Sequence, residues 1–473
     1  MNKTIRSLLS GSALVCVGFA PALVNAQSMN QEQMLRRMEA LESELQALKG
    51  QMATTQATAA TAQAAAQKAA ADNSGVKVST AGGIKVETTD GNFSASLGGR
   101  LLVDQAFYDE DKTRMGDGAE VRSIRLDVTG QVYKDWIYKL QADFGVGINN
   151  GSAVLKDTYF GYQGWGPLVE ILAGNYLEPI SLDNMTSNKY TTFMEPALPQ
   201  QTLQDRRLGV QVTARGSNWT AAGGIFSANV DTTGNDPAGE GDSGWDLSGR
   251  FTYAPIMTKT EVVHLGFGIN DRNPNSEALR YRARPESHET GARLIDTGAI
   301  ANVTDAITFE PEAAVVLGPF HSEAEYQWLT VHRGAGSPDL DFHGWYAVAG
   351  WFLTGEVRPY QLKDTPYSAD FARVKPLHNL GDGGFGAFEV AARYSSLDLS
   401  DANVRGGGER DVTLGLNWYV NPFVRFMFNY VKVDTDNEAN PAGLGNAANL
   451  IPGNANAGND DPSIFQLRGQ VDF

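Results

Sequence analysis

Residues 135–148 read DWIYKLQADFGVGI, and this stretch carries the pattern on which the fold depends. Trp136, Tyr138 and Leu140 alternate with Lys139 and Gln141, so an extended backbone places the apolar side chains on one face and the polar ones on the other. The same alternation recurs in VRSIRLDVTGQV (121–132), WDLSGRFTY (245–253), VRFMFNY (424–430) and FQLRGQVDF (465–473). The pattern predicts β-strands from residue 82 to the C-terminus.

A soluble β-sandwich would show the same alternation, so three further features decide between the two architectures. The segments run to roughly 10–13 residues, which is the length of a tilted membrane strand. Short connections such as 133–134 and 216–217 alternate with long polar ones such as 231–244 and 434–462. Aromatic residues gather near the strand ends, as in interfacial belts. We therefore expect an all-β chain that forms an antiparallel transmembrane β-barrel of about 16 strands, with residues 279–284 inside a long connection.

Composition excludes several other classes of protein. The net charge of −17, from 38 Lys and Arg against 55 Asp and Glu, argues against a nucleic-acid partner. No apolar run beyond the N-terminus reaches the length of a spanning helix. The six histidines lack metal-ligand spacing, and no nucleophile motif is present, so we expect no enzyme, no cofactor and no metal site.

The N-terminal part predicts export. Residues 1–26 have a basic start with Lys3 and Arg6, a short apolar run and small residues near Ala26, which is typical of a signal peptide. The only cysteine, Cys16, lies within this segment. The remaining domains are then a helical segment at 27–75 and a barrel at 82–473.

The helical segment carries a heptad pattern. Its apolar positions are Met34, Met38, Leu41, Leu45, Leu48 and Met52, with spacings of four and three, and the phase continues through an Ala-rich stretch. The pattern indicates a coiled coil between identical chains, and the alternative is a single amphipathic helix. Such a segment could also bind peptidoglycan.

Several stretches are similar to one known family. They are FSASLGGR (93–100), TSNKY (186–190), VHLG (263–266), LTGE (353–356), AARY (391–394), TLGLNWY (413–419) and NYVK (429–432). In their order and spacing they resemble the phosphate-selective porins of the O/P type, over about residues 82–473. The resemblance implies a homotrimer of 16-stranded outer-membrane barrels in Gram-negative bacteria, with a third loop folded inward to narrow each pore.

By this resemblance, the connection from about Tyr176 to Arg206 is the constriction loop. Its charged residues are Glu178, Asp183, Lys189, Glu195 and Asp205, with Arg206 and Arg207 at its end. The family places a lysine at the constriction, and the matching position here is Asn184. The loop thus offers carboxylates where the family offers a cation.

A second feature matches the arginine ladder of the family. Arg280, Arg282 and Arg284 alternate with Tyr281 and Ala283, so an extended backbone places three guanidiniums on one side. Arginine pairs well with phosphate oxygens. Four further inward-facing cations are Arg125, Lys139, Arg250 and Arg425. They either add to the anion pathway or balance carboxylates such as Asp127, Asp143, Asp246 and Asp411 around the wall.

These features favour an outer-membrane channel for passive diffusion of small anions such as phosphate or pyrophosphate. Asn184 and the negative net charge favour the alternative of a general porin, or of a porin for a different solute. A third hypothesis is a protein that tethers the envelope through residues 27–75 and uses its barrel as an anchor. The expected partners are small anions, outer-membrane lipid and identical subunits.

Overall fold

The computed structural model describes residues 31–71, 75–80, 83–145, 153–166, 168–227, 244–275, 277–363, 365–436 and 459–473. The proposed signal peptide at 1–26 lies outside these residues. The chain divides into two units, Met1–Ser74 and Gly75–Phe473. The first contains one long helix, α1 (Gln31–Ala71). Among the described residues, no helix combines the length and the hydropathy needed to cross a bilayer.

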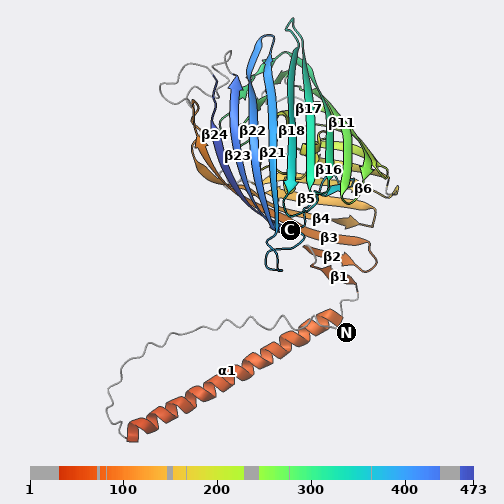
Figure 1. The fold of residues 1–473 in the computed structure, drawn as a ribbon. Coiled ribbons are helices and arrows are strands. Elements are labelled where there is room, and N and C mark those ends of the chain that lie inside the picture. The colour runs from red at the N-terminus through yellow and green to blue at the C-terminus, as the bar shows by residue number, and fades with distance from the viewer. Residues whose placement is uncertain are drawn as a thin grey trace. The chain divides into compact units, whose positions relative to one another are not determined.

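The second unit is a closed antiparallel β-barrel (Figure 1). Sixteen strands form it, which confirms the predicted antiparallel barrel and its strand number. Strand β24 pairs with β3 from Ser463 opposite Asp109 to Asp472 opposite Arg100, and this pairing closes the sheet. The barrel strands are β3 (Phe93–Asp109), β4 (Gly118–Val132), β5 (Trp136–Asp143), β6 (Val154–Tyr162), β7 (Val169–Tyr176), β8 (Arg207–Arg215), β9 (Trp219–Phe226), β10 (Trp245–Met257), β11 (Glu261–Asn273), β16 (Val303–Leu317), β17 (Phe320–Arg333), β18 (Leu340–Phe352), β21 (Ala387–Asp401), β22 (Val404–Asn421), β23 (Val424–Asp436) and β24 (Ser463–Asp472).

Two short strands extend the sheet outside the barrel. β1 (Val76–Ser79) pairs with β2 (Ile84–Thr88), and β2 pairs with the first part of β3, from Ile84 opposite Leu97 to Glu87 opposite Ser94. Strand β24 pairs only with the later part of β3, from Arg100 to Asp109. The first part of β3 therefore pairs on the same edge with β2 of the β1–β2 hairpin (Figure 1).

Side chains alternate along the strands as predicted. On β10, Trp245, Leu247 and Phe251 are exposed, whereas Asp246 and Arg250 are buried. The apolar residues therefore face outward and the polar ones face the lumen. This inside-out pattern is the one expected of a barrel whose exterior contacts lipid.

The two ends of the barrel differ in their connections. Tight turns at 133–135, 216–218, 258–260, 318–319 and 422–423 lie at the same end as the C-terminus. The connection at 353–386 belongs to this end too, but it is long and contains β19 (Tyr360–Gln361) paired with β20 (Asp370–Phe371). The alternation of short and long connections did not predict this exception.

Three long connections lie against inward-facing side chains of the wall. The 177–206 loop contains α2 (Leu182–Met185) and a 3₁₀ helix, η1 (Leu198–Thr202). The 274–302 loop contains β12 (Ala278–Leu279), β13 (Arg282–Ala283), β14 (Ile295–Asp296) and β15 (Ile300–Ala301). The third is the 353–386 loop.

Glycines on the wall make room for the 177–206 loop. A Cβ on Gly344 of β18 would lie 2.8 Å from Cβ of Pro199, and one on Gly268 of β11 would lie 2.6 Å from Ile180. Any larger residue at these two positions would push the loop away from the wall. The resemblance predicted an inward-folded loop from 176 to 206, and the structure places residues 177–206 there.

Candidate functional site in the barrel lumen

A central cavity of about 630 Å³ lies inside the barrel, and one of its walls is rich in cations. Arg100 comes from β3, Arg122 and Arg125 from β4, Lys139 from β5 and Lys156 from β6. These strands are neighbours in the sheet, so their inward-facing side chains gather on one side. Much of the remaining lining comes from the 177–206 loop.

Several of these cations are neutralised by carboxylates. Nε of Arg125 lies 2.6 Å from Oδ2 of Asp143. Asp157 accepts from Nζ of Lys139 at 3.0 Å and from Nε of Arg206 at 2.6 Å. Asp157 also accepts a hydrogen bond of 2.7 Å from the hydroxyl of Tyr367, which belongs to the 353–386 loop. These ion pairs fix the position of each side chain and cancel much of its field.

Among the described residues, no carboxylate lies within ion-pair distance of Arg100 or Lys189. Arg100 is only 6% exposed, its Nε donates to Ser123 Oγ at 3.2 Å, and its Nη1 donates to Asn188 Oδ1. The Nη2 of Arg100 is buried without a hydrogen-bond partner. Burial lowers the pKa of Lys189, and the charge of Asp472 partly offsets this effect. Both residues thus bring positive charge to the cavity without an ion pair to a carboxylate of the described chain.

Asn184 also lines the central cavity, and its Nδ2 is buried without a hydrogen-bond partner. The side chain of Asn184 therefore offers an N–H donor where the family has a lysine. Asp183 lines the cavity beside it, and burial together with Glu323 raises its pKa to about 6.

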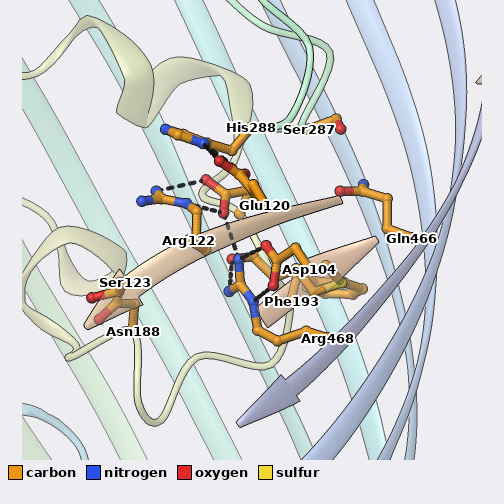
Figure 2. A network of polar contacts seen from close by, with 12 residues as sticks. Asp104, Glu120, Arg122, Ser123, Asn188, Phe193, Ser287, His288, Gln466 and Arg468 are labelled. Carbon is orange, nitrogen blue, oxygen red and sulfur yellow. Dashed lines mark hydrogen bonds and ion pairs between the residues drawn. The ribbon is translucent and has the colours of Figure 1, made fainter. Parts of the chain in front are cut away.

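A second set of charges holds the 177–206 loop to the wall (Figure 2). Arg468 of β24 donates to both carboxylate oxygens of Asp104, at 2.7 and 2.6 Å. Glu195 of the loop lies between Arg468, at 2.8 Å, and Arg122, at 2.9 Å. Burial acts to raise the pKa of Glu195, but Arg122 and Arg468 outweigh it and hold that pKa well below its usual range. Glu195 therefore stays ionised and cancels part of the charge of Arg122.

His288 lies near this network. Its Nδ1 is 2.8 Å from Oε1 of Glu120, and the ring points toward that carboxylate in Figure 2. His288 comes from the 274–302 loop and lines the central cavity. The 274–302 loop therefore contributes to the lining of the central cavity.

A further cavity of about 310 Å³, here called the arginine cavity, is lined by Arg280, Arg282, Arg284 and Arg293 together with residues 201–204. The alternation expected from the sequence holds, because Tyr281 and Ala283 are buried in an apolar cluster and the arginines are not. The ring of Tyr281 lies 6.2 Å from that of Phe342 on β18.

The four arginines of this cavity differ in their partners. Nε of Arg280 donates to Oδ1 of Asp296 at 2.7 Å, and this hydrogen bond raises the pKa of Arg280. For Arg293, burial and the charges of Arg284 and Arg282 lower the pKa to about 10. The arginine cavity thus keeps an excess of positive charge.

One glutamine joins the 177–206 loop to the arginine segment. Nε2 of Gln201 donates to the carbonyl of Arg284, and the backbone N–H of Arg284 donates to Oε1 of Gln201, both at 2.8 Å. Arg284 lines the arginine cavity and the central cavity. Gln201, Leu203 and Gln204 line both cavities too, so Arg284 is the charged residue among those at which the two cavities meet.

The other expected site residues divide into two groups. Asp183, Asn184, Lys189, Arg206, Arg125 and Lys139 line the central cavity. Arg207, Arg250 and Arg425 are not among its lining residues. Arg207 pairs with Asp246 at 3.0 Å and with Glu178 at 3.5 Å.

Arg250 and Arg425 point inward as predicted, but each is covered by a loop. Arg250 is an ion-pair partner of Glu312, and its guanidinium donates to the carbonyls of Ser368 and Ala369 in the 353–386 loop. Arg425 donates to the carbonyl of Thr191 at 2.8 Å. Both arginines therefore hold inward-folded loops, which is a different position from the water-filled path expected from the sequence.

The cavity residues that were not predicted from the sequence include Arg100, Arg122, Lys156, Arg293 and Tyr367. Arg100 had a signal, because it alternates with outward-facing Leu101 on a predicted strand. Arg293 and Tyr367 had none, since both lie in irregular loops. No group of three or more His, Cys, Asp or Glu suited to a metal ion occurs in the described part of the chain.

Comparison with known proteins agrees with this geometry. Residues 95–473 match the family model of phosphate-selective porin O and P. Porin O of Pseudomonas aeruginosa is 30% identical over 443 residues, which cover 85% of this chain and 93% of that protein. An uncharacterized protein of Caulobacter vibrioides is 32% identical over 358 residues, covering 73% of this chain and 70% of that protein.

Among solved structures, the anion-selective porin from Comamonas acidovorans has a similar fold. Its TM-score is 0.51 at 13% identity, and the match covers 80% of this chain and 100% of that one. The family and the fold place the protein in the outer membrane of a Gram-negative cell. The chain belongs to the phosphate-selective porin O and P family.

Proposed function

We propose that this porin is a passive diffusion channel for small anions, with phosphate or pyrophosphate as the preferred solutes. The observation that carries the proposal is the position of Arg284. It lines both cavities and has no ion pair with a carboxylate among the described residues. A cation at this junction attracts an anion from one cavity to the next without consuming energy.

The pathway begins at Arg282 and Arg293, continues at Arg284 and reaches Arg100 and Lys189 in the central cavity. Successive cations of this kind create overlapping potentials, so that an anion moves between weak sites instead of stopping at one. Arg100 lines that cavity and adds its positive charge there, although its Nη2 is buried and has no hydrogen-bond partner among the described residues. Arg280, which is paired with Asp296, contributes less.

Bilayer measurements test the proposal. The purified protein is placed in planar bilayers, the reversal potential is measured in a KCl gradient, and phosphate is then added as a competitor of chloride. We expect an anion-selective reversal potential and a block of the chloride current by phosphate. A cation-selective channel would contradict the proposal, and an anion-selective channel insensitive to phosphate would limit it to general anions.

The alternative of a porin for a different solute rests on Asn184. An Asn184→Lys variant separates the two hypotheses. In a phosphate channel, the variant should strengthen a phosphate block that the original protein already shows. In a channel for another solute, phosphate should block the variant but not the original protein.

We also propose that the barrel forms a homotrimer, as the family resemblance implies, and that residues 1–26 are a signal peptide. The short strands of the wall from β5 to β9 support the homotrimer, because β5, β7 and β9 have only 8 residues each. Membrane strands usually have about 9–11 residues, so a neighbouring subunit is a better cover for this wall than lipid. Cross-linking of the purified protein followed by mass measurement tests the copy number, and a monomer would contradict it.

A tethering role for residues 27–75 remains a second proposal, favoured by the length of α1, which has 41 residues. Deleting residues 27–75 should leave conductance unchanged and reduce co-sedimentation with peptidoglycan. Unchanged co-sedimentation would exclude this role.

A further inference from the structure

Helix α1 carries an apolar seam that nothing in the described unit covers. Met38, Leu41, Leu45, Leu48 and Met52 are between 57% and 60% exposed. They repeat at spacings of three and four residues, so they lie on one side of the helix. Large apolar side chains in one such line are normally buried against a partner.

The charges beside this seam indicate which partner fits it. In the heptad that places Leu41 and Leu48 at d, Arg37 and Glu44 occupy g, and Glu42 and Lys49 occupy e. When two identical helices lie parallel and in register, each g residue faces the e residue five positions later on the other helix. Arg37 then faces Glu42, and Glu44 faces Lys49, so both contacts join opposite charges. The next such pair, Gln51 with Gln56, is neutral.

These pairs have no equivalent within one helix. Side chains contact along a helix at spacings of three or four residues, and residues five apart do not face each other. Neither Glu44 nor Lys49 has an oppositely charged residue three or four positions away. The complementarity therefore serves contacts between chains.

A lipid surface is a poorer partner. Helices that lie on anionic membranes carry Lys and Arg on the polar face. Here the charged residues of the first half of α1 include Glu32, Glu39, Glu42 and Glu44, against three cations, Arg36, Arg37 and Lys49. With Lys68 in the second half, acids and cations balance, so α1 has no net positive charge to attract it to anionic lipid.

We infer that residues 34–52 bind the same segment of the neighbouring copies of this chain as a parallel, in-register coiled coil. The Ala-rich half, 53–71, continues the same phase with small residues, so it holds the helices together weakly and acts mainly as a spacer. The inference concerns α1 alone and stands whether or not the barrel selects anions.

Single cysteines in the full-length protein test the geometry. Leu41→Cys and Leu48→Cys each place a thiol at d, where the two copies are adjacent in a parallel, in-register coil. Each should give a disulfide-linked dimer after mild oxidation, seen on a denaturing gel without reductant. Ser43→Cys, on the outer face of the same helix, should give no dimer, and the chain without an added cysteine controls for Cys16. In an antiparallel coil at most one of the two d positions would cross-link, and that result, or the absence of dimer for both, would overturn the inference.

Charge reversal tests the pairing. In the Leu41→Cys protein, Glu44→Lys opposes Lys49 with a like charge and should reduce the dimer band, whereas Glu44→Lys with Lys49→Glu should restore it. A helix that acts alone would respond to neither change, because residues five apart do not interact within it. A band that stays reduced in the double variant would contradict the register. Reversal potentials of the same variants in bilayers should be unchanged, which separates this inference from the anion pathway.

Discussion

Replacing Arg284 with Gln tests the anion pathway at the point where its two cavities meet. A unit charge and a monovalent anion about 4 Å apart in water attract each other by about 1 kcal/mol, and a doubly charged phosphate by about 2 kcal/mol. Since about 1.4 kcal/mol corresponds to a tenfold change in affinity, the variant should bind chloride about five-fold and hydrogen phosphate about thirty-fold more weakly at this point. Salt screens the effect, so these are values for low ionic strength.

The assay is block of the chloride current by phosphate in planar bilayers at low salt. We expect the phosphate concentration for half-block to rise by a larger factor than the factor by which the chloride conductance falls. The matched control is Arg280→Gln with Asp296→Asn, because that pair shares a hydrogen bond of 2.7 Å and its removal leaves the net charge of the arginine cavity unchanged. In this control variant, phosphate should block the chloride current at the same concentration as in the original protein.

Two results would refute the reasoning. One is an Arg284→Gln channel with unchanged half-block, which would mean that phosphate does not pass this residue. The other is a neutral control that loses as much affinity as Arg284→Gln, because the geometry of the loop would then matter and the charge would not.

Three further predictions concern the supports of the pathway. Gln201→Leu removes both hydrogen bonds to the backbone of Arg284, so it should weaken phosphate block, and it should add nothing in an Arg284→Gln background. Asp183, with a pKa raised to about 6, is mostly ionised at pH 7 and mostly protonated at pH 5. Acidification should therefore increase the anion selectivity measured from reversal potentials. The Asp183→Asn variant should lack the part of this change that is centred near pH 6. Arg250→Gln removes the arginine partner of Glu312 and leaves that carboxylate with His264 at 2.9 Å, so it should lower the free energy of unfolding by about 3–5 kcal/mol in urea titrations of the folded barrel. An Arg250→Gln barrel with full stability but altered ion selectivity would instead indicate that Arg250 lies on the anion pathway.

The barrel could be predicted from the sequence because its two surroundings are so different. Lipid outside and water or polar groups inside impose a period of two on every strand, and the period is visible in single segments such as 245–253. In the 274–302 loop the same alternation separates Arg280 and Arg282 from Tyr281, which lies between them and packs against Phe342.

What covers an inward-facing side chain was not predictable in the same way. Arg125 and Arg250 occupy equivalent faces of their strands, yet Arg125 borders the central cavity and Arg250 lies under Ser368 and Ala369. Strand periodicity fixes the direction of a side chain, whereas the path of an irregular loop of 34 residues at 353–386 depends on tertiary contacts. The pairing of Arg280 with Asp296 was hidden for the same reason, since the two residues meet only when the 274–302 loop folds back on itself.

The net charge of −17 and an anion pathway are compatible because the two signs lie in different surroundings. On the wall from β16 to β22, Glu310, Glu389, Glu409 and Asp411 are at most 1% exposed, so they do not meet the solute. The 177–206 loop contributes to this burial. Gln200 of the loop donates to Glu310. Asn417 of the wall donates both to Glu389 and to the carbonyl of Thr192 in the loop. The wall from β3 to β6 instead presents its cations to the central cavity. A charge acts on a permeating ion through the water of the pore, so the sum over the chain carries little information about selectivity. The charge that matters is that of the cavity lining, where Arg100, Lys189 and Arg284 form no ion pair with a carboxylate in the part of the chain that the structure describes.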